Sequence, residues 1–394
     1  MDSVRNPFAP GAGTPPPELA GRADVLESTQ TALLRLAAGK SIQPPILVGL
    51  RGVGKTVLLV KMQQIADTEG FVVVSIEACE GRSFAELLAP GLRTALLSLS
   101  MVEAAKEKAK RGLGVLKSFM SGFNLAYAGV ELNYTPTVGV ADSGSLEADL
   151  PELLVELGEA AAAAHRPVVI FVDELQVLKP IEFSALIMAI HKINQKQLPL
   201  AFIGAGLPQV LALAGNSKSY SERLFVFPEI GALSEEDAVA AIVNPALSED
   251  VKFEPEAVSE ILRVTERYPY FLQQWAHDSW NIAQGETITW SDVLDAFDTS
   301  TAALDRSFFR VRYDRCRPAE QGYMRALAEL GPGIRRSSDL AYLLGKKVDA
   351  IVPTRASLIK KGMIYAPSVG EVCFTVPMFD AFMKRAIPDF AGAT

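Results

Sequence analysis

Hydrophobic residues in the first 230 positions form short runs that alternate with longer segments of helical periodicity. Each short run has the length of a strand buried on both faces, and the runs lie at 46–48, 71–78, 168–173, 200–206 and 224–227. Segments with a helical pattern separate them, for example 146–165 and 183–195. The alternation predicts an α/β fold, with a parallel sheet that carries helices on both faces.

The pattern changes after this sheet. Residues 231–305 are helical throughout, with Ser234 placed to cap the first helix, and we expect an α-helical lid there. Residues 306–394 contain helical segments at 319–330, 337–345 and 353–362, then two short strands around a glycine turn at 363–376. This order predicts a C-terminal winged-helix domain. The first 18 residues are rich in proline and glycine, so we expect a flexible segment before the sheet domain of residues 19–230.

One stretch interrupts the alternation. About residues 100–145 form a long insertion, with a basic helical segment followed by a hairpin-like pattern at 125–139. Two interpretations stay open for it, a protruding contact element for DNA or a partner, and a surface flap packed on its own domain.

Residues Gly49–Thr56, GLRGVGKT, match the phosphate-binding pattern GxxxxGK[ST] between a strand and a helix. Glycines let backbone N–H groups and the positive end of the helix dipole approach phosphate oxygens. Lys55 is placed to reach the β- and γ-phosphates, and the Thr56 hydroxyl to ligate Mg²⁺. The motif therefore predicts a nucleoside triphosphate site made of Gly49, Leu50, Arg51, Gly52, Val53, Gly54, Lys55, Thr56 and Val57.

A second motif extends this prediction from binding to hydrolysis. The run VVIFVDE at 168–174 ends in two carboxylates, which are costly as packing elements at the end of an apolar strand. Alone, the pair is equally consistent with a solvated strand end. Together with the phosphate loop, it indicates that Asp173 holds the Mg²⁺ shell and that Glu174 polarises the attacking water.

Length, hydropathy and cysteine usage set the broad class. A chain of 394 residues has room for two or three domains, and no apolar run approaches the about 18 residues of a membrane span. The three cysteines are far apart, and the N-terminus has no apolar signal core. We therefore expect a cytoplasmic protein without membrane contact, disulfide frame or zinc site.

Charge is distributed unevenly along the chain. From Arg306 onward there are 15 Lys and Arg against 8 Asp and Glu, a net +7, whereas the preceding residues carry a net −15. We expect residues 306–394 to bind double-stranded DNA, with Thr354, Arg355 and Ser357 facing a major groove. The phosphate contacts would come from Lys346, Lys347, Lys360 and Lys361. A basic domain that docks on the acidic body of its own chain is the other interpretation.

With these motifs in this order, residues 19–384 resemble the AAA+ ATPases of the origin-recognition/initiator type and their archaeal-ATPase and STAND relatives. The resemblance implies ATP/ADP and Mg²⁺ as ligands. LAGRADVLE is similar to a box that lies beside the adenine and places Gly21 and Arg22 near the base. SERLFVFPEIGALS is similar to the segment with the arginine finger, so Arg223 would reach the γ-phosphate of a neighbouring subunit in a homo-oligomer. The other interpretation of Arg223 is an ordinary surface ion pair.

The lid and the strand at 200–206 match this group less closely. RYPYFLQ at 267–273 resembles the GxP motif of STAND proteins, in which Pro269 would pack on the base, although a simple helix start is an equal explanation. Arg263 or Arg267 would be a second sensor. After LAFIG, where the group places a polar sensor, this chain has Ala205, Gly206, Leu207 and Pro208.

The sequence thus predicts a Mg²⁺-dependent ATPase, with Lys55, Glu174 and Arg223 as catalytic residues, that binds DNA through its winged helix. ATP would favour an assembled form. The alternative is a STAND-like nucleotide switch in signalling or defence, in which the winged helix docks on protein and no DNA is bound.

Overall fold

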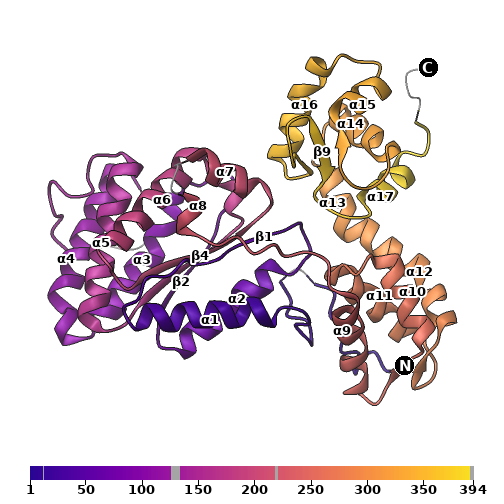
Figure 1. The fold of residues 1–394 in the computed structure, drawn as a ribbon, viewed down its shortest axis with the longest axis horizontal. Helices are drawn as coiled ribbons and strands as arrows, with labels where there is room; N and C mark the ends of the chain where they lie inside the picture. The colour runs from indigo at the N-terminus through magenta and orange to yellow at the C-terminus, as the bar shows by residue number, and fades with distance from the viewer. Residues whose placement is uncertain (12, 126–133, 218–220, 391–394) are drawn as a thin grey trace. The chain divides into compact units, whose positions relative to one another are not determined.

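The computed structural model describes residues 1–11, 13–125, 134–217 and 221–390. They form two compact units (Figure 1). We call residues 22–48 and 55–229 the sheet unit. Residues 1–21, 49–54 and 230–394 are the helical unit, which includes most of the phosphate loop. Within the described ranges, no helix combines the length and apolarity that crossing a bilayer requires.

A four-stranded parallel sheet forms the centre of the sheet unit. Its order is β1 (Ile46–Val48), β4 (Leu200–Gly206), β3 (Val168–Asp173) and β2 (Val72–Glu77). Strand β3 is central and buried along its length except at Asp173, its last residue. The predicted α/β fold with a parallel sheet is confirmed, and the carboxylate pair lies at the carboxyl end of the sheet.

The fifth run, at 224–227, differs from the expected strand. It contributes only an isolated bridge between Pro45 and Val226, followed by one between Val48 and Glu229. Pro44, Pro45 and Pro228 lie in or beside this pairing and lack the N–H that a continuous ladder needs.

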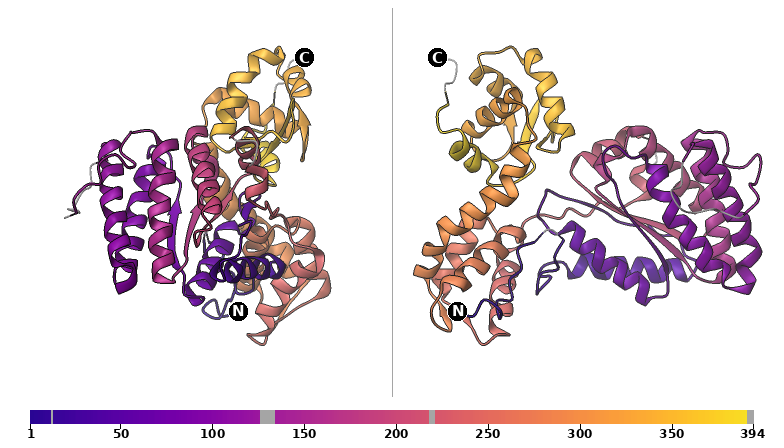
Figure 2. Two further views of the ribbon diagram at one scale, coloured as in Figure 1. Left: turned by 60° about the vertical axis from the view of Figure 1, so that its left-hand side comes forward. Right: turned by 180° about the vertical axis from the view of Figure 1, so that it is seen from behind.

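Helices cover both faces of this sheet (Figures 1 and 2). Helices α1 (Ala23–Ala37) and α2 (Lys55–Thr68) lie on one face. The other face carries α3 (Phe84–Ser100), α5 (Leu146–Ala164) and α6 (Pro180–Gln195). The short elements η1 (Glu103–Ala105), η2 (Leu175–Val177), α7 (Gln209–Ser217) and α8 (Ser221–Leu224) complete the unit.

Helix α4 (Lys106–Gly122) is the basic segment of the insertion, and it packs on α3 and α5. Leu113, Leu116 and Phe119 are fully buried. Several of its basic side chains pair with acidic ones, for example Lys108 with Glu159 at 3.4 Å and Arg111 with Glu156 at 3.0 Å. These contacts fit the flap interpretation better than a DNA contact. The hairpin expected at 125–139 lies largely outside the described residues.

The helical unit begins with α9 (Glu235–Leu247), α10 (Pro255–Thr265) and α11 (Pro269–Ile282). The strands β5 (Lys252–Phe253) and β6 (Thr287–Ile288) pair in parallel beside them. A continuous rod of α12 (Trp290–Leu304), the π-helical turn η3 (Asp305–Phe309) and α13 (Arg310–Tyr313) leads into the C-terminal domain (Figure 2).

The N-terminal segment, expected to be flexible, packs on these helices instead. Phe8 is 2% exposed and meets the rings of Phe253 and Trp280. The indole N–H of Trp280 donates to the Asp2 carbonyl at 3.0 Å. Composition suggested a flexible chain, but the buried Phe8 ring and polar contacts such as the 3.2 Å ion pair of Arg5 with Glu249 anchor the segment.

The C-terminal domain contains α14 (Pro318–Glu329), β7 (Arg335–Arg336), α15 (Ser337–Leu343) and α16 (Val348–Lys360). Strands β8 (Ile364–Tyr365) and β9 (Glu371–Phe374) follow, then α17 (Phe379–Ala386), and the sheet order is β7-β9-β8 with antiparallel pairing. Helix α16 begins five residues before the expected start, with Pro353 inside it. Pro353 and Asp349, whose carbonyl would receive the missing N–H bond, are both exposed, so water can replace that bond.

A buried carboxylate fixes α16 against α14. Glu320 is 3% exposed and accepts hydrogen bonds from the Lys361 ammonium and the Ser357 hydroxyl, each at 2.6 Å. Burial raises the pKa of Glu320, but these bonds and one from the Arg317 N–H outweigh burial and lower the pKa to about 2. Ser357 and Lys361 therefore stabilise the domain interior and are not available as expected for DNA.

We expect Glu320→Gln to lower the free energy of unfolding by about 2 kcal/mol at pH 7, because the charge-assisted bonds weaken. The depressed pKa means that the carboxylate's contribution is complete above the ordinary value of 4.5 and is lost as the pH falls toward 2. Urea unfolding at pH 7 and pH 3.5 should show a smaller difference between wild type and variant at the lower pH. An equal difference at both values, or an equal effect of the surface control Asp389→Asn, would contradict the assignment.

Candidate nucleotide-binding site

The phosphate loop connects β1 to α2, and its glycines are required by the local packing. A Cβ on Gly49 would lie 2.1 Å from the Ile230 carbonyl oxygen, too close for any side chain. Gly52 has φ +83°, and a Cβ there would meet Tyr270 at 3.3 Å and Tyr268 at 3.4 Å. The loop therefore presents backbone where a phosphate group needs close approach.

Helix α2 begins at Lys55, which is 8% exposed, and Thr56 follows. The Thr56 hydroxyl donates to Asp173 Oδ2 at 2.6 Å, across from the first turn of α2 to the end of β3. A hydroxyl next to a carboxylate is a donor set that Mg²⁺ accepts, so Thr56 and Asp173 fit the metal role predicted for them.

The charged neighbours of Asp173 leave room for a cation to stabilise its carboxylate. Burial raises the pKa of the carboxyl group, while the bonds from the Thr56 hydroxyl and the Glu174 N–H, and the charge of Lys55, act in the opposite direction. A partly buried carboxylate whose charge is incompletely compensated gains stabilisation from a divalent ion.

Glu174 adopts a left-handed backbone conformation, with φ 56° and ψ 37°. Such a conformation costs of order 1 kcal/mol in a residue with a Cβ, and strain of this kind is concentrated at functional sites. Its N–H donates to Asp173 Oδ1 at 2.8 Å, so the backbone of Glu174 helps to orient the Asp173 carboxylate.

Gln176, on η2, is a site residue that the sequence did not indicate. Its amide donates to Glu174 Oε2, and its Oε1 accepts from the Leu207 N–H at 2.8 Å, just beyond β4. The side chain thus links the predicted catalytic carboxylate to the strand where a polar sensor was missing. The available signal was a polar residue two positions after the acid pair, in an otherwise apolar stretch.

Replacing Gln176 with Leu should reduce kcat for ATP hydrolysis about tenfold and change KM less than about twofold, because Glu174 loses its orientation but the phosphate loop is untouched. Steady-state phosphate release measures both constants. Gln195→Leu, on the exposed end of α6, is the matched control. A change confined to KM would show that Gln176 does not position Glu174.

The helical unit holds the phosphate loop through backbone bonds. The Arg51 N–H donates to the Thr375 carbonyl and the Tyr270 N–H donates to the Gly52 carbonyl, both at 3.3 Å. Tyr268 is 4% exposed, and its hydroxyl has no hydrogen-bond partner among the described residues. Burial raises the pKa of Tyr268, so the phenol stays neutral. Pro269 lies between these two tyrosines, as the first residue of α11.

The other residues predicted for the nucleotide site differ in exposure and in the elements that carry them. Leu50 is half-buried, Val53 is 1% exposed, and Gly54 and Val57 continue the loop and α2. Arg22 occupies the N-cap position of α1 and is half-buried, whereas Arg223 is exposed on α8, where its carbonyl accepts a hydrogen bond from the Gln43 amide. Of the two sensor candidates, Arg263 binds Glu260 at 2.6 Å, and Arg267 is exposed.

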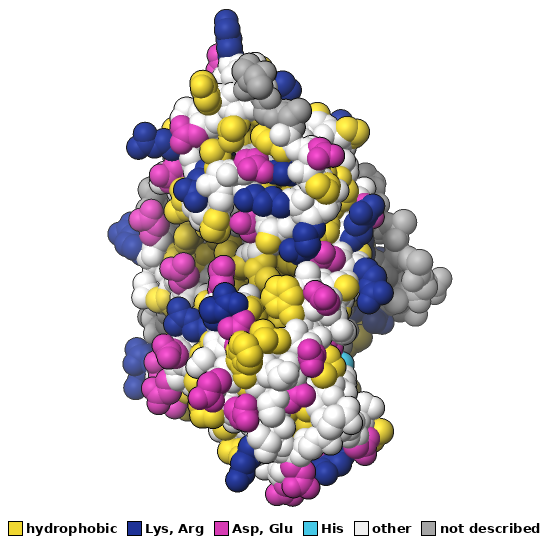
Figure 3. Space-filling view, turned by 90° about the vertical axis from the view of Figure 1, so that its right-hand side faces the viewer, with side chains coloured by type: hydrophobic (Ala, Val, Ile, Leu, Met, Phe, Trp, Pro, Cys, Tyr) yellow, Lys and Arg dark blue, Asp and Glu magenta, His cyan; other side chains and the backbone are white. Residues whose placement is uncertain are grey.

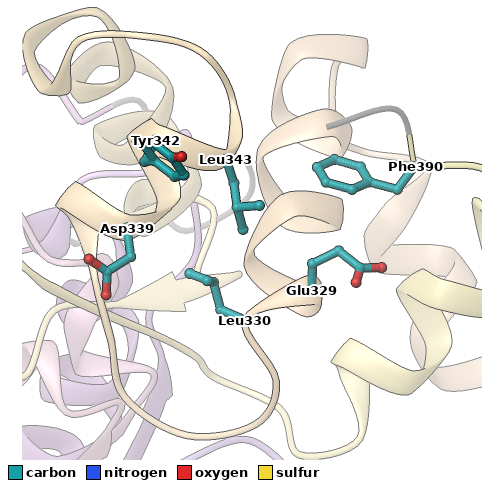
Figure 4. Close-up of a pocket in the computed structure, with 6 residues that line it drawn as sticks. All are labelled: Glu329, Leu330, Asp339, Tyr342, Leu343 and Phe390. Carbon is teal, nitrogen blue, oxygen red and sulfur yellow. The ribbon is translucent and has the colours of Figure 1, made fainter. Parts of the chain in front are cut away.

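A surface pocket of about 550 Å³ lies elsewhere, in the C-terminal domain (Figure 4). The side chains of Leu330, Leu343 and Phe390 point toward the same space. Arg325 holds this end of the chain, since its guanidinium donates to the Ile387 carbonyl at 2.5 Å and lies over the Phe390 ring. None of the candidate nucleotide residues lines this pocket, so it is separate from the nucleotide site.

Comparison with known proteins agrees with this geometry. Residues 18–203 match the model of the AAA ATPase domain. The matched range includes the phosphate loop, the acid pair, strands β1, β2 and β3, and the beginning of β4. Residues 306–383 match a domain of unknown function (DUF8462), and no curated protein matches the chain.

Three solved structures are similar to the chain at 14% identity. The Walker-type ATPase PABY2304 of Pyrococcus abyssi has a TM-score of 0.56, with 94% of this chain and 97% of that chain covered. The Orc1 protein of Aeropyrum pernix in complex with DNA has a TM-score of 0.48, with 93% of each chain covered. The RuvB Holliday junction branch migration motor of Thermotoga maritima has a TM-score of 0.43, with 90% of this chain and 92% of that chain covered. At these values only the first likeness indicates a shared fold.

Proposed function

We propose that this chain hydrolyses ATP in a Mg²⁺-dependent reaction. The observation that carries the proposal is the 2.6 Å hydrogen bond between Thr56 and Asp173, beside the strained Glu174. This pairing joins the phosphate loop to a carboxylate in the way that a metal-assisted phosphoryl transfer requires.

Each residue has a distinct role in this proposal. Backbone N–H groups of the loop and the Lys55 ammonium bind the phosphates, and Thr56 and Asp173 hold Mg²⁺, which neutralises phosphate charge when bound. Glu174 orients the attacking water and accepts its proton, while Gln176 fixes the carboxylate. Arg22 and Pro269 would lie near the base.

Phosphate release from ATP, measured with Mg²⁺ and with excess EDTA, tests the proposal. We expect turnover only with Mg²⁺, and Thr56→Ala should raise the Mg²⁺ concentration needed for half-maximal rate about tenfold. Turnover that persists in EDTA, or no turnover under either condition, would refute it.

Arg223 would act on the nucleotide of a neighbouring subunit in a homo-oligomer. It is exposed on α8, so it is available to a neighbouring subunit's γ-phosphate, as an arginine finger would be. Arg223→Ala added to wild-type protein should then reduce turnover of the mixture by more than dilution alone.

For the C-terminal domain, we propose duplex DNA as a ligand bound through its phosphates. Its charge of +7, its exposed Lys346, Lys347 and Lys360, and the order of three helices and a hairpin support this. Base reading by Arg355 is not part of the proposal, because this guanidinium donates to the Glu371 carbonyl at 2.9 Å. Anisotropy of labelled DNA with a non-hydrolysable ATP analogue should show salt-sensitive binding that varies little with sequence.

One observation favours a second candidate, a nucleotide switch without DNA. The C-terminal domain contacts the phosphate loop directly, through the Arg51 N–H and the Thr375 carbonyl. A domain bonded to the loop can respond to the nucleotide bound there. ADP that copurifies with the protein, slow turnover and no DNA binding would together favour this candidate.

A further inference from the structure

Helix α12 carries a row of large apolar side chains on an exposed face. Trp290, Leu294 and Phe297 follow one another at i, i+4 and i+7, and they are 48%, 40% and 43% exposed. The inner face of the same helix is formed by Val293, Ala296 and Leu304, which are buried. Phe297 rests against the buried ring of Trp275 at 6.0 Å, so the row has a rigid support. A contiguous row of this kind differs from scattered surface leucines and is a candidate binding surface.

The rim of this row is acidic. Asp295 and Asp298 alternate with the apolar residues on α12, and both are exposed. Figure 3 shows that acidic side chains gather on the lower part of this side of the molecule, where the first helices of the helical unit lie. We call Trp290, Leu294, Phe297, Asp295 and Asp298 the α12 surface.

Helix α16 carries a second apolar row with the opposite rim charge. Val348 and Val352 are 44% and 48% exposed, and exposed Ala356 continues the row one turn later. Exposed Lys346 and Lys347 lie at its start and Lys360 at its end, while Asp349 is its one acidic residue. We call these residues the α16 surface.

The α16 surface is poorly suited to reading bases. Of the three residues of α16 expected to face a major groove, Arg355 and Ser357 bond to Glu371 and Glu320 inside the domain, and Thr354 is half-buried. What remains outside is aliphatic along the helix and basic at both ends. A protein partner with an apolar centre and an acidic rim also matches this arrangement, because it would cover the aliphatic residues that DNA phosphates leave exposed.

We propose that the α12 surface of one copy binds the α16 surface of a second copy. The two surfaces match in kind, since each is an apolar helix row of similar length, and in charge, since one rim is acidic and the other basic. Both are exposed within the same unit, so they do not cover each other inside one copy. Two different surfaces that pair between identical chains make a head-to-tail contact, which builds a ring or filament.

This contact goes beyond the proposed ATPase and uses none of its residues. It does use lysines proposed for DNA, so self-association and DNA binding compete for Lys346, Lys347 and Lys360. A charge swap separates the two, because swapped charges can restore a protein contact but cannot restore attraction to phosphates.

Sedimentation velocity of the full chain between roughly 1 and 100 µM tests the proposal. We expect wild-type protein to associate with rising concentration. The α16 variant Lys346→Glu/Lys347→Glu/Lys360→Glu and the α12 variant Asp295→Lys/Asp298→Lys should each remain monomeric, because both rims then carry the same charge. An equimolar mixture of the two variants should associate again, since each then meets an oppositely charged rim. Trp290→Ala should weaken wild-type association at least about tenfold.

The control is Glu256→Lys/Glu286→Lys, which reverses two exposed carboxylates of the same unit outside α12 and should associate as wild type. Retained nucleotide binding by every variant shows that the chain is folded. A wild type that stays monomeric overturns the proposal, and so does association that both charge variants retain. If the α16 variant loses DNA binding while wild type never associates, the α16 surface belongs to DNA instead.

Discussion

Replacing Glu174 with Gln is expected to lower kcat for ATP hydrolysis by about 100-fold or more, with ATP affinity within about threefold of wild type. Glutamine keeps the shape of the glutamate side chain, and its carbonyl oxygen can accept the hydrogen bond from the Gln176 amide. It cannot accept a proton from water. The left-handed backbone of Glu174 is unchanged by this substitution, so the expected loss is chemical and not conformational.

Single-turnover phosphate release and binding of a fluorescent ATP analogue measure the two quantities separately. Glu77→Gln is the matched control, because Glu77 is exposed and lies at the end of β2, opposite Asp173 in the sheet register. Unchanged turnover in Glu174→Gln would assign the water-activating role to another group. A similar loss in Glu77→Gln would show that local charge, not this carboxylate, sets the rate.

Replacing Lys55 with Ala should weaken ATP binding by at least about 100-fold, roughly 3 kcal/mol. The ammonium is 8% exposed at the first turn of α2, and it lies close enough to Asp173 to influence the pKa of that carboxyl group. Its removal deletes a phosphate ligand and leaves the loop with backbone donors only.

Titration with the fluorescent ATP analogue gives the affinity directly. Lys61→Ala, an exposed position on the same helix, controls for loss of charge on α2. Thermal unfolding without nucleotide separates a binding defect from a folding defect. Equal ATP affinity in wild type and Lys55→Ala would show that this lysine does not bind the phosphates.

Sequence patterns located the central parts of the fold and the site because those parts depend on neighbours along the chain. Strand β3 is a continuous apolar run that ends at Asp173, and the order of strand, loop and helix around Gly49–Thr56 is a local feature. The parallel sheet then follows from short runs joined by helices, since parallel neighbours need a crossover.

Other features depend on residues that are distant in sequence. Gln176 became part of the site because η2 lies beside the end of β4, thirty-one residues away, where Leu207 supplies a donor. Net charge alone does not distinguish among the basic residues of the C-terminal domain. Packing distinguishes Arg355 and Lys361, which bond inside the domain, from Lys346 and Lys347, which remain on its surface.

The sequence by itself therefore determined the phosphate loop, the acid pair and the α/β class, because each is encoded in a contiguous run whose spacing is set by backbone geometry. Tertiary structure alone decided which polar residues are free to act. It buried Glu320 with its partners and anchored the N-terminus through Phe8. It also left Trp290, Leu294 and Phe297 exposed, because only one face of α12 has a neighbouring helix to pack on.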